Sequence, residues 1–419
     1  GKIFFFFFRA PIAISILVKV GSDAHELYYH DIGYYLSRKE KLQILENSSN
    51  IDGLGWQKIT PDENQDWINQ RDPNYQKYIF LYDRTNGVFS SQLVGIGTNR
   101  DAWVTGFSSS KVRENCQIFI SHYNSEVEKA SSDPRYIQNR DSEYIKWTRK
   151  LNRYYESKTP ILYNDNKIKQ IMYRPFTKKW LYFDEKVVEY PSRYGRVWGT
   201  NNVALITNGR GGNKNFSPLV VNVMPDCQLL ANDAVFPLDI KDEQAGVLLI
   251  NDSYSNVNSD FTKKMGLDSE HVLAYIYGLL SSSEYQQKYA NDLKKDLARI
   301  PVVAEKEKYV EVGKKLIDLH INYEEVPAYE GVQIVACENP SYVVKKMKFG
   351  KKRDAESGKL EKDKSTIVFN SDITIKDIPE KAYEYVVNGR SAIEWIIDQY
   401  QVKTDKKSGI TDDPNDFSS

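Results

Sequence analysis

Residue types that could support catalysis are scattered along this sequence of 419 residues. The five histidines have no metal-ligand spacing, so a zinc or non-haem iron site has little support. The sequence contains no G-x-S-x-G nucleophile elbow, no phosphate-binding P-loop and no Rossmann G-x-G-x-x-G motif. Asp184 and Glu185, next to Lys186, resemble part of a metal-dependent nuclease site, but 57 acidic residues make such a match expected by chance. The sequence therefore predicts a chain without a catalytic centre.

One motif resembles the base-binding loop of adenine methyltransferases. The apolar run GVQIVAC is followed by Asn339, Pro340, Ser341 and Tyr342, where those enzymes have Asn-Pro-Pro-Tyr. In such enzymes the polar side chain and the prolyl carbonyl hold the amino group of a flipped adenine, and the aromatic ring stacks on the base. Here Ser341 replaces the second proline, no glycine-rich loop for S-adenosylmethionine precedes the run, and a lysine-rich segment follows it. We interpret these residues as a turn.

Positive charge is concentrated in one part of a chain whose formal net charge is zero, a balance that by itself disfavours a nucleic-acid binder. Residues 135–214 contain 17 Lys and Arg against 7 Asp and Glu, a net charge of +10, so the remainder carries −10. Fourteen Tyr, Trp and Phe residues lie in the same stretch. This composition is typical of a surface that faces nucleic-acid phosphates. A solvated basic face would have the same composition.

The cysteines indicate the compartment. Cys116, Cys227 and Cys337 stand alone, without a C-x-x-C pair. This spacing argues against a disulfide framework or a zinc site and favours a reducing cytoplasm.

The N-terminal residues 2–20 are strongly apolar. Arg9 and Pro11 divide them into two runs that are each too short to cross a bilayer. We expect two core strands there, roughly 3–8 and 12–19, and no membrane association. A chain that begins within a strand and lacks an initiating methionine is expected to be a fragment of a longer protein.

Local signals predict the helices. Ser37 and Glu40 form an S-x-x-E capping box before EKLQILEN, so a short helix should begin there. A helix of about five turns is expected over 108–130, capped by Ser109 or Ser110. Its apolar stripe comprises Val112, Cys116, Phe119 and Tyr123.

The remaining segments alternate in type. A basic amphipathic segment over 140–160 spaces its cations over a few turns, and a β-rich region follows to about 250. The glycine-rich TNGRGGNK (207–214) within it is interpreted as a turn, and helices return over 268–322. A strand pair joined by a lysine-rich, solvated loop (351–364) and a last helix near 389–400 complete the chain. The cations of the basic segment are Arg140, Lys146, Arg149, Lys150 and Arg153.

Seven blocks carry a resemblance to a known family. By these blocks, in this order, the whole chain resembles the C-terminal portion of the type ISP restriction-modification enzymes, bacterial single polypeptides that run nuclease, translocase, adenine methyltransferase and target-recognition domain. The blocks are DIGYYLSRKEKL (31–42), DWINQRD (66–72), TNRDAWV (98–104), YRPFTKKWLYFD (173–184), FPLD (236–239), YIYGLLSSSEYQQKYANDLKKDLARIP (275–301) and NGRSAIEWIIDQYQVKTDKKSGITDDPND (388–416).

The resemblance implies an α+β fold, with strands left from a methyltransferase α/β domain and then a mixed β-rich target-recognition domain with helical sections. No cofactor is expected in this chain, whereas S-adenosylmethionine, ATP and Mg²⁺ are expected for the parent enzyme. The implied domains are 1–50, the methyltransferase tail; 51–160, a helical linking part; 161–265, the β-rich DNA-recognition core; 266–330, a helical section; and 331–419, a C-terminal β-hairpin and helix.

The resemblance also implies a function, namely recognition of a double-stranded DNA sequence so that the upstream domains methylate a target adenine or restrict the DNA. A protein- or RNA-interaction module, the specificity part of another combined enzyme, and a complete methyltransferase or nuclease remain alternatives. Arg174 and Phe176 of YRPF are either architectural or in contact with DNA. Cations suit phosphates, while Arg and Asn can bond a base edge in two places. We expect backbone contacts from Arg149, Arg153, Lys178, Lys179 and Arg193, and base reading from Arg210, Asn213 and Lys214.

Overall fold

The structure is a computed structural model of the chain, and it divides into two compact units, residues 1–72 and 73–419. The division into five domains expected from the sequence stays a prediction. The residues that the structure describes are 14–19, 21, 25–33, 36–199, 201–211, 215–230, 232–241, 253–354 and 358–416.

The first unit contains a short strand pair and one helix. Strand β1 (Leu27–Tyr29) pairs antiparallel with β2 (Gln57–Ile59), and the single-turn helix η1 spans Ile51–Gly53. Helix α1 (Arg38–Ser48) begins at the predicted capping box, in which Ser37 and Glu40 each bond the other's backbone N–H.

The prediction of a core strand over 12–19 is wrong for the residues of that range that the structure describes. Residues 14–19 are neither helix nor strand, and Leu17 is almost fully exposed. No described strand pairs with them, so an extended backbone there would leave its N–H and C=O groups without ladder partners. The strand expected over 3–8 lies outside the described residues.

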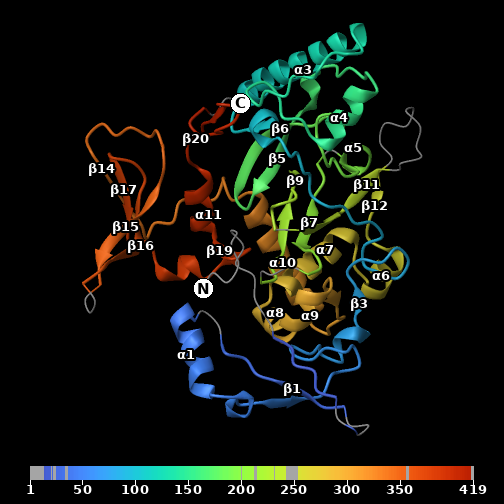
Figure 1. The fold of residues 1–419 in the computed structure, drawn as a ribbon, viewed down its shortest axis with the longest axis vertical. Coiled ribbons are helices and arrows are strands. Elements are labelled where there is room, and N and C mark those ends of the chain that lie inside the picture. Colours follow the sequence, from blue (N-terminus) through green and yellow to red (C-terminus); the bar gives the residue numbers. More distant parts are fainter. Residues whose placement is uncertain are drawn as a thin grey trace. The chain divides into compact units, whose positions relative to one another are not determined.

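A four-stranded sheet is central to the second unit (Figure 1). Its middle strands β5 (Ile168–Arg174) and β6 (Thr177–Tyr182) form an antiparallel hairpin. Strand β4 (Thr105–Gly106) pairs with β6, and β9 (Met224–Pro225) runs parallel to β5.

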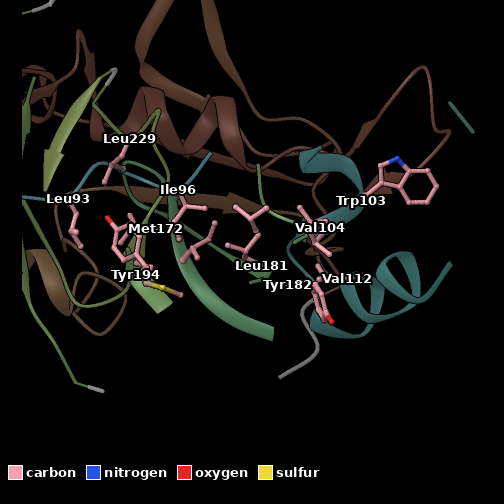
Figure 2. Close-up of a cluster of buried hydrophobic side chains, with 14 of the residues drawn as sticks. Leu93, Ile96, Trp103, Val104, Val112, Met172, Leu181, Tyr182, Tyr194 and Leu229 are labelled. Atoms are coloured by element: carbon pink, nitrogen blue, oxygen red, sulfur yellow. The ribbon is translucent and has the colours of Figure 1, made fainter. Parts of the chain in front are cut away.

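Helix α3 (Ser109–Ser132) packs on this sheet. Its predicted apolar stripe from Val112 to Tyr123 is buried, as expected from 3.6-residue periodicity. The N-cap is Ser108, one residue before the two serines we expected, and its side chain accepts a hydrogen bond from the Lys111 N–H. Figure 2 shows Val112 among the other side chains of this first core, which include Leu93, Ile96, Trp103, Val104, Met172, Leu181, Tyr182, Tyr194 and Leu229.

A second core lies between a three-stranded sheet and helices. Strands β10 (Asp233–Pro237), β7 (Ala204–Asn208) and β8 (Leu219–Val221) are antiparallel neighbours in that order. Helix α7 (Ser269–Ser281) contributes most of its own length to this core, helix α10 (Lys306–Ile321) adds Val310, and further buried side chains come from residues 75–89 and from residues 257–300.

The C-terminal residues build a third, smaller core around the sheet β14-β17-β16-β15. Helix α11 (Ala392–Gln399) begins at a second capping box, formed by Ser391 and Glu394. The strands here are β14 (Gln333–Ala336), β15 (Lys348–Arg353), β16 (Leu360–Val368) and β17 (Ile373–Lys376), followed by the short pairs β18 (Val386–Val387) with β19 (Arg390–Ser391) and β20 (Lys403–Thr404) with β21 (Thr411–Asp412).

Three further segments differ from expectation. The basic segment is helical only at its end, as α4 (Arg149–Glu156), because the Thr148 side chain before it is held in a buried polar network. The helix expected after α7 is broken into α8 (Ser283–Lys288) and α9 (Ala290–Lys295), where Tyr289 turns into the second core. The lysine-rich loop expected over 351–364 is largely paired strand, since β15 and β16 continue into it.

The architecture is α+β, as predicted, and no helix of the described chain is both long and apolar enough to span a membrane. The remaining elements are η2 (Tyr75–Lys77), β3 (Ile79–Phe80), α2 (Asp101–Val104), η3 (Asp165–Lys167), α5 (Tyr194–Val197), β11 (Asp239–Lys241), β12 (Ser253–Ser255), α6 (Ser259–Met265), β13 (Arg299–Ile300) and η4 (Glu380–Tyr383).

Candidate nucleic-acid interface

The β5–β6 turn carries the YRPF block, and its side chains point into the protein. Arg174 Nη1 donates to Asp226 Oδ1 at 2.7 Å, and the guanidinium lies 4.0 Å from the Tyr173 ring centroid. Burial raises the pKa of Asp226 to about 6, although the nearby guanidinium opposes that shift. Phe176, at φ +57°, makes edge-to-face contacts with His320 and Tyr323. Arg174 and Phe176 therefore both make architectural contacts in this structure.

The two lysines that follow on β6 are paired with carboxylates. Lys178 Nζ lies 2.7 Å from Glu324 Oε2, and its side chain is only 15% exposed. Lys179 is 8% exposed, and its Nζ lies 2.6 Å from Asp412 Oδ2. The Lys179 ammonium also lies over the Phe107 ring at 4.5 Å. A buried, paired ammonium cannot meet a phosphate without losing its partner, so we do not assign Lys179 to the DNA contact.

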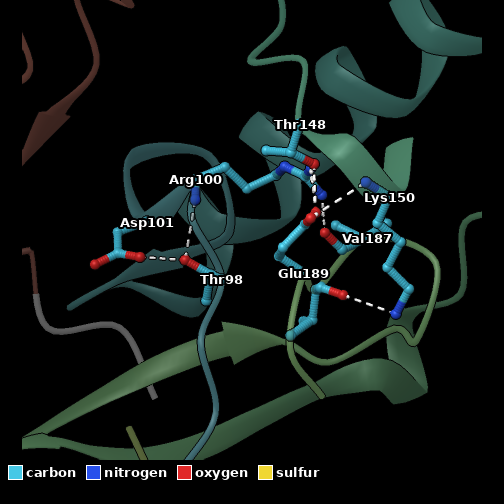
Figure 3. A network of polar contacts seen from close by, with 8 residues as sticks. Thr98, Arg100, Asp101, Thr148, Lys150, Val187 and Glu189 are labelled. Atoms are coloured by element: carbon cyan, nitrogen blue, oxygen red, sulfur yellow. Dashed lines mark hydrogen bonds and ion pairs between the residues drawn. The ribbon is translucent and has the colours of Figure 1, made fainter. Parts of the chain in front are cut away.

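A buried polar network fixes the start of α4 (Figure 3). Arg100, whose side chain is fully buried, donates to the Val187 carbonyl and to Thr148 Oγ1, and lies 3.7 Å from Glu189 Oε2. Thr148 in turn donates to Glu189, and the Lys150 N–H donates to the same carboxylate at 3.2 Å. Burial lowers the pKa of Arg100 to about 10, opposed by the charge of Glu189.

This network positions the exposed cations of α4. Leu151 is fully buried, which anchors one face of the helix. Arg149 and Arg153 are exposed and four residues apart, so they lie on one face of α4, one turn from each other. Arg140 and Lys146, expected in the same basic amphipathic segment, precede α4 and lie outside any helix.

Arg193 lies on the segment that leads away from the network, four residues after Glu189. It is exposed, and its Nη2 donates to Ser91 Oγ at 2.9 Å. Helix α5 follows at once and presents Arg196, which is also exposed. The Glu189 carboxylate thus holds the start of α4 close to the segment that leads into α5. Exposed arginines lie on both of these segments.

Arg210 belongs to a different part of the second unit. It follows β7 in the predicted turn, and its Nε lies 2.8 Å from Asp296 Oδ1, at the end of α9. Its side chain is 65% exposed, and its hydrogen bond to Asp296 engages Nε. Asn213 and Lys214 lie outside the described residues.

Sequence reasoning singled out TNRDAWV as a block but missed its role. The contacts of the Arg100 side chain have no local sequence signal, because its guanidinium partners lie 48 and more residues away. Block membership was the signal that could have found it. The Asn339–Tyr342 motif follows an exposed strand, as a turn would.

No cluster of three or more His, Cys, Asp or Glu side chains suited to a metal ion occurs in the described part of the chain. Asp184, singled out as a possible nuclease fragment, pairs with Lys167 and accepts from the Lys186 N–H at 2.7 Å. These contacts hold a turn.

The family follows from comparison with known proteins. Residues 87–419 match the model of the Type ISP C-terminal specificity domain, which covers more than half of the chain. The chain therefore belongs to the Type ISP C-terminal specificity domain family. None of the curated proteins compared with the chain matches it.

Solved structures agree in fold. A nuclease-deletion mutant of the Type ISP restriction-modification enzyme LlaGI, in complex with a DNA substrate mimic, has a TM-score of 0.83 and 42% identity, over 96% of this chain and 31% of that one. The ATP-dependent Type ISP enzyme LlaBIII, bound to DNA, has a TM-score of 0.80 and 37% identity, over 94% and 26%. The DrdV–DNA complex has a TM-score of 0.77 over 94% and 40%, but at 22% identity it shows the fold alone. This chain spans less than half the length of each of these proteins.

Proposed function

We propose that this chain recognises a short double-stranded DNA sequence for a restriction-modification enzyme. In this role it holds the duplex so that an upstream methyltransferase domain can flip and methylate a target adenine, and the same recognition directs restriction. The observation that carries the proposal is membership in the specificity-domain family, together with two relatives, 42% and 37% identical, that are described as bound to DNA. S-adenosylmethionine, ATP and Mg²⁺ would serve other domains of such a polypeptide.

The exposed arginines around the Glu189 network suit the phosphate backbone. Arg149 and Arg153 extend from a helix anchored by a buried leucine, which gives their charges a rigid base. Arg193 is exposed on the segment that the same network holds. Backbone contacts of this kind set affinity and orientation but carry no sequence information.

Arg210 is the described residue best suited to base reading. A guanidinium can bond guanine O6 and N7 together. The ion pair of Arg210 uses Nε, and its side chain is 65% exposed. We propose that Asn213 and Lys214 act with it, as the sequence suggests.

The test is selection of bound sequences from a randomised duplex pool by this chain, at two salt concentrations. Enrichment of one short asymmetric site containing an adenine would support the proposal. Salt-sensitive binding without enrichment would indicate a backbone clamp that needs its methyltransferase to read bases. Absence of binding, or preference for single-stranded RNA, would refute it.

Variants separate the two kinds of contact. Replacing Arg149 and Arg153 by Ala should weaken binding to all sequences and reduce the slope of log K against log salt by about 2. Replacing Arg210 by Ala should instead relax selection at one base pair, by about 1–3 kcal/mol. The control is Lys315→Ala, an exposed cation on α10 that pairs with Glu311. If the Arg210 variant selected an unchanged site, its base-reading assignment would be wrong.

A further inference from the structure

The pair β15–β16 extends beyond the sheet to which it belongs (Figure 1). Strand β17 pairs with β16 only at Ile367 and Val368, and the register of β15 with β16 shifts after Phe349. From there, Gly350–Arg353 pairs with Leu360–Asp363, and no third strand joins this ladder within the described residues. We call these two segments the arm. Phe349 and Ile367 pack in the third core and anchor its base.

All the charged residues on one face of the arm are cations. Directly opposed residues of an antiparallel pair project to the same side, and alternate residues share a face. Lys351 is opposite Lys362, and Arg353, two residues further along, is opposite Leu360. All four side chains are exposed. This cationic face, Lys351, Arg353 and Lys362, therefore contains no carboxylate.

The other face is neutralised. Lys352 is opposite Glu361, and its charge is among the causes that lower the pKa of Asp363, after the hydrogen bonds from Ser365 and Thr366. Charges of opposite sign thus gather on one side of the arm, while like charges gather on the other. A pair of like charges directly opposite each other, with Cβ atoms about 5 Å apart, destabilises a ladder.

A two-stranded ribbon is at best marginally stable by itself, and the Lys351–Lys362 pair weakens it further. An anionic partner on the cationic face would offset that repulsion. Lys351 and Arg353 lie about 7 Å apart along the strand, roughly the axial rise of two nucleotides of one DNA strand. The major groove of B-DNA admits a two-stranded β-ribbon.

We propose that the arm lies along a groove of duplex DNA and that its cationic face contacts the phosphates. The proposal rests on the proposed function and adds to it a second, structurally separate DNA contact, in the C-terminal sheet. An alternative role for the lysines is protection of β15, an edge strand, from pairing with another chain. In that case their removal would cause aggregation and leave DNA binding as it was.

The test uses the whole 419-residue chain and a random-sequence duplex, with affinity measured by fluorescence anisotropy at about 50 mM and 200 mM salt. We expect Lys351→Gln and Lys362→Gln each to reduce the slope of log K against log salt by about 0.9. The fall in affinity between the two salt concentrations should then be about threefold smaller for each variant, and the double variant should show both effects. Lys352→Gln, on the neutralised face, is the matched control and should leave the slope as in the wild type.

Thermal unfolding and light scattering are measured for each variant, to detect unfolding or aggregation. All three substitutions replace exposed side chains. An unchanged slope in the double variant, with or without aggregation, would overturn the arm proposal and leave the proposed function standing. An equal change in Lys352→Gln would overturn it too, because the effect would then be one of total charge. Absence of duplex binding by the wild-type chain would overturn both proposals.

Discussion

At the scale of single residues, the buried carboxyl of Asp233 at the start of β10 carries the clearest electrostatic signature. Its Oδ1 accepts the Gly95 N–H at 3.0 Å, whereas its Oδ2 is buried without a hydrogen-bond partner among the described residues. Burial, reinforced by the charge of Asp226, raises the pKa of Asp233 to about 7 from its usual 3.8. The folded protein therefore binds this proton more tightly than the unfolded chain does.

The sign of the resulting pH dependence follows from linkage. The stabilisation from protonated Asp233 is complete below the unfolded-state pKa near 3.8 and is lost as the pH rises through about 7. We expect Asp233→Asn, which keeps the acceptor for Gly95, to flatten the fall in unfolding free energy between pH 5 and pH 8 by about 2 kcal/mol. Urea unfolding across that range measures it. His320, whose burial lowers its pKa to about 4, acts in the opposite direction below pH 6.5, so the comparison is between variant and wild type.

The control for this prediction is Asp260→Asn, since Asp260 is an exposed carboxylate on α6. It should follow the wild-type curve at every pH. A difference between Asp233→Asn and the wild type that stays constant from pH 5 to pH 8 would contradict the assignment of the raised pKa.

At the scale of elements, the backbones of helices α7 and α10 come close together at two glycines, Gly278 and Gly313. A Cβ added to Gly313 would lie 1.8 Å from the Ala274 carbonyl oxygen, and one added to Gly278 would lie 2.3 Å from that of Tyr309. Both obstacles are backbone atoms, so no side-chain rotation relieves them. The helices must separate to accept a methyl group, and the second core opens with them.

We expect Gly313→Ala to lower the unfolding free energy by about 1–3 kcal/mol, although alanine raises helix propensity by nearly 1 kcal/mol. Lys315→Ala, an exposed change on the same helix, should stay within about 0.5 kcal/mol of the wild type. Midpoints of urea unfolding measure both. A Gly313→Ala variant more stable than the wild type would show that the two helices do not pack this closely.

Local patterns predicted the elements whose causes are local. The Ser37–Glu40 capping box and the stripe of α3 need only neighbours within a few residues, and both are confirmed. The start of α4 depends on Arg100, far away in the sequence, so periodicity extended the helix too far. The lysine-rich arm was predicted to be a loop because lysine and aspartate disfavour strands, whereas the hydrophobic base of β15–β16 imposes the pairing. The positions of Arg149 and Arg153 at the surface were predictable, but the pairing of Lys178 and Lys179 was not.

At the scale of the whole second unit, adjacent lysines of β6 hold distant segments to the central sheet. Lys178 pairs with Glu324, just after α10, and Lys179 pairs with Asp412, on β21. The second oxygen of Asp412 accepts the Phe107 N–H at 2.9 Å. One carboxylate near the end of the chain thus joins both β6 and the segment that leads into α3.

Removing this carboxylate should be costly, because it leaves a buried ammonium without its partner. We expect Asp412→Ala to lower the unfolding free energy by about 3–5 kcal/mol, and Lys179→Met in that background to recover much of the loss, since an apolar side chain of similar length needs no partner. Asp416→Ala, an exposed change four residues later, is the control.

The same lysine variant separates a structural charge from one that binds DNA. Lys179→Met should bind duplex DNA with the wild-type salt slope, whereas the Arg149 and Arg153 variant should not. If Lys179→Met instead reduced the salt slope by about 0.9, the amount expected for one phosphate contact, Lys179 would contact DNA. Its ion pair with Asp412 would then have to open when DNA binds.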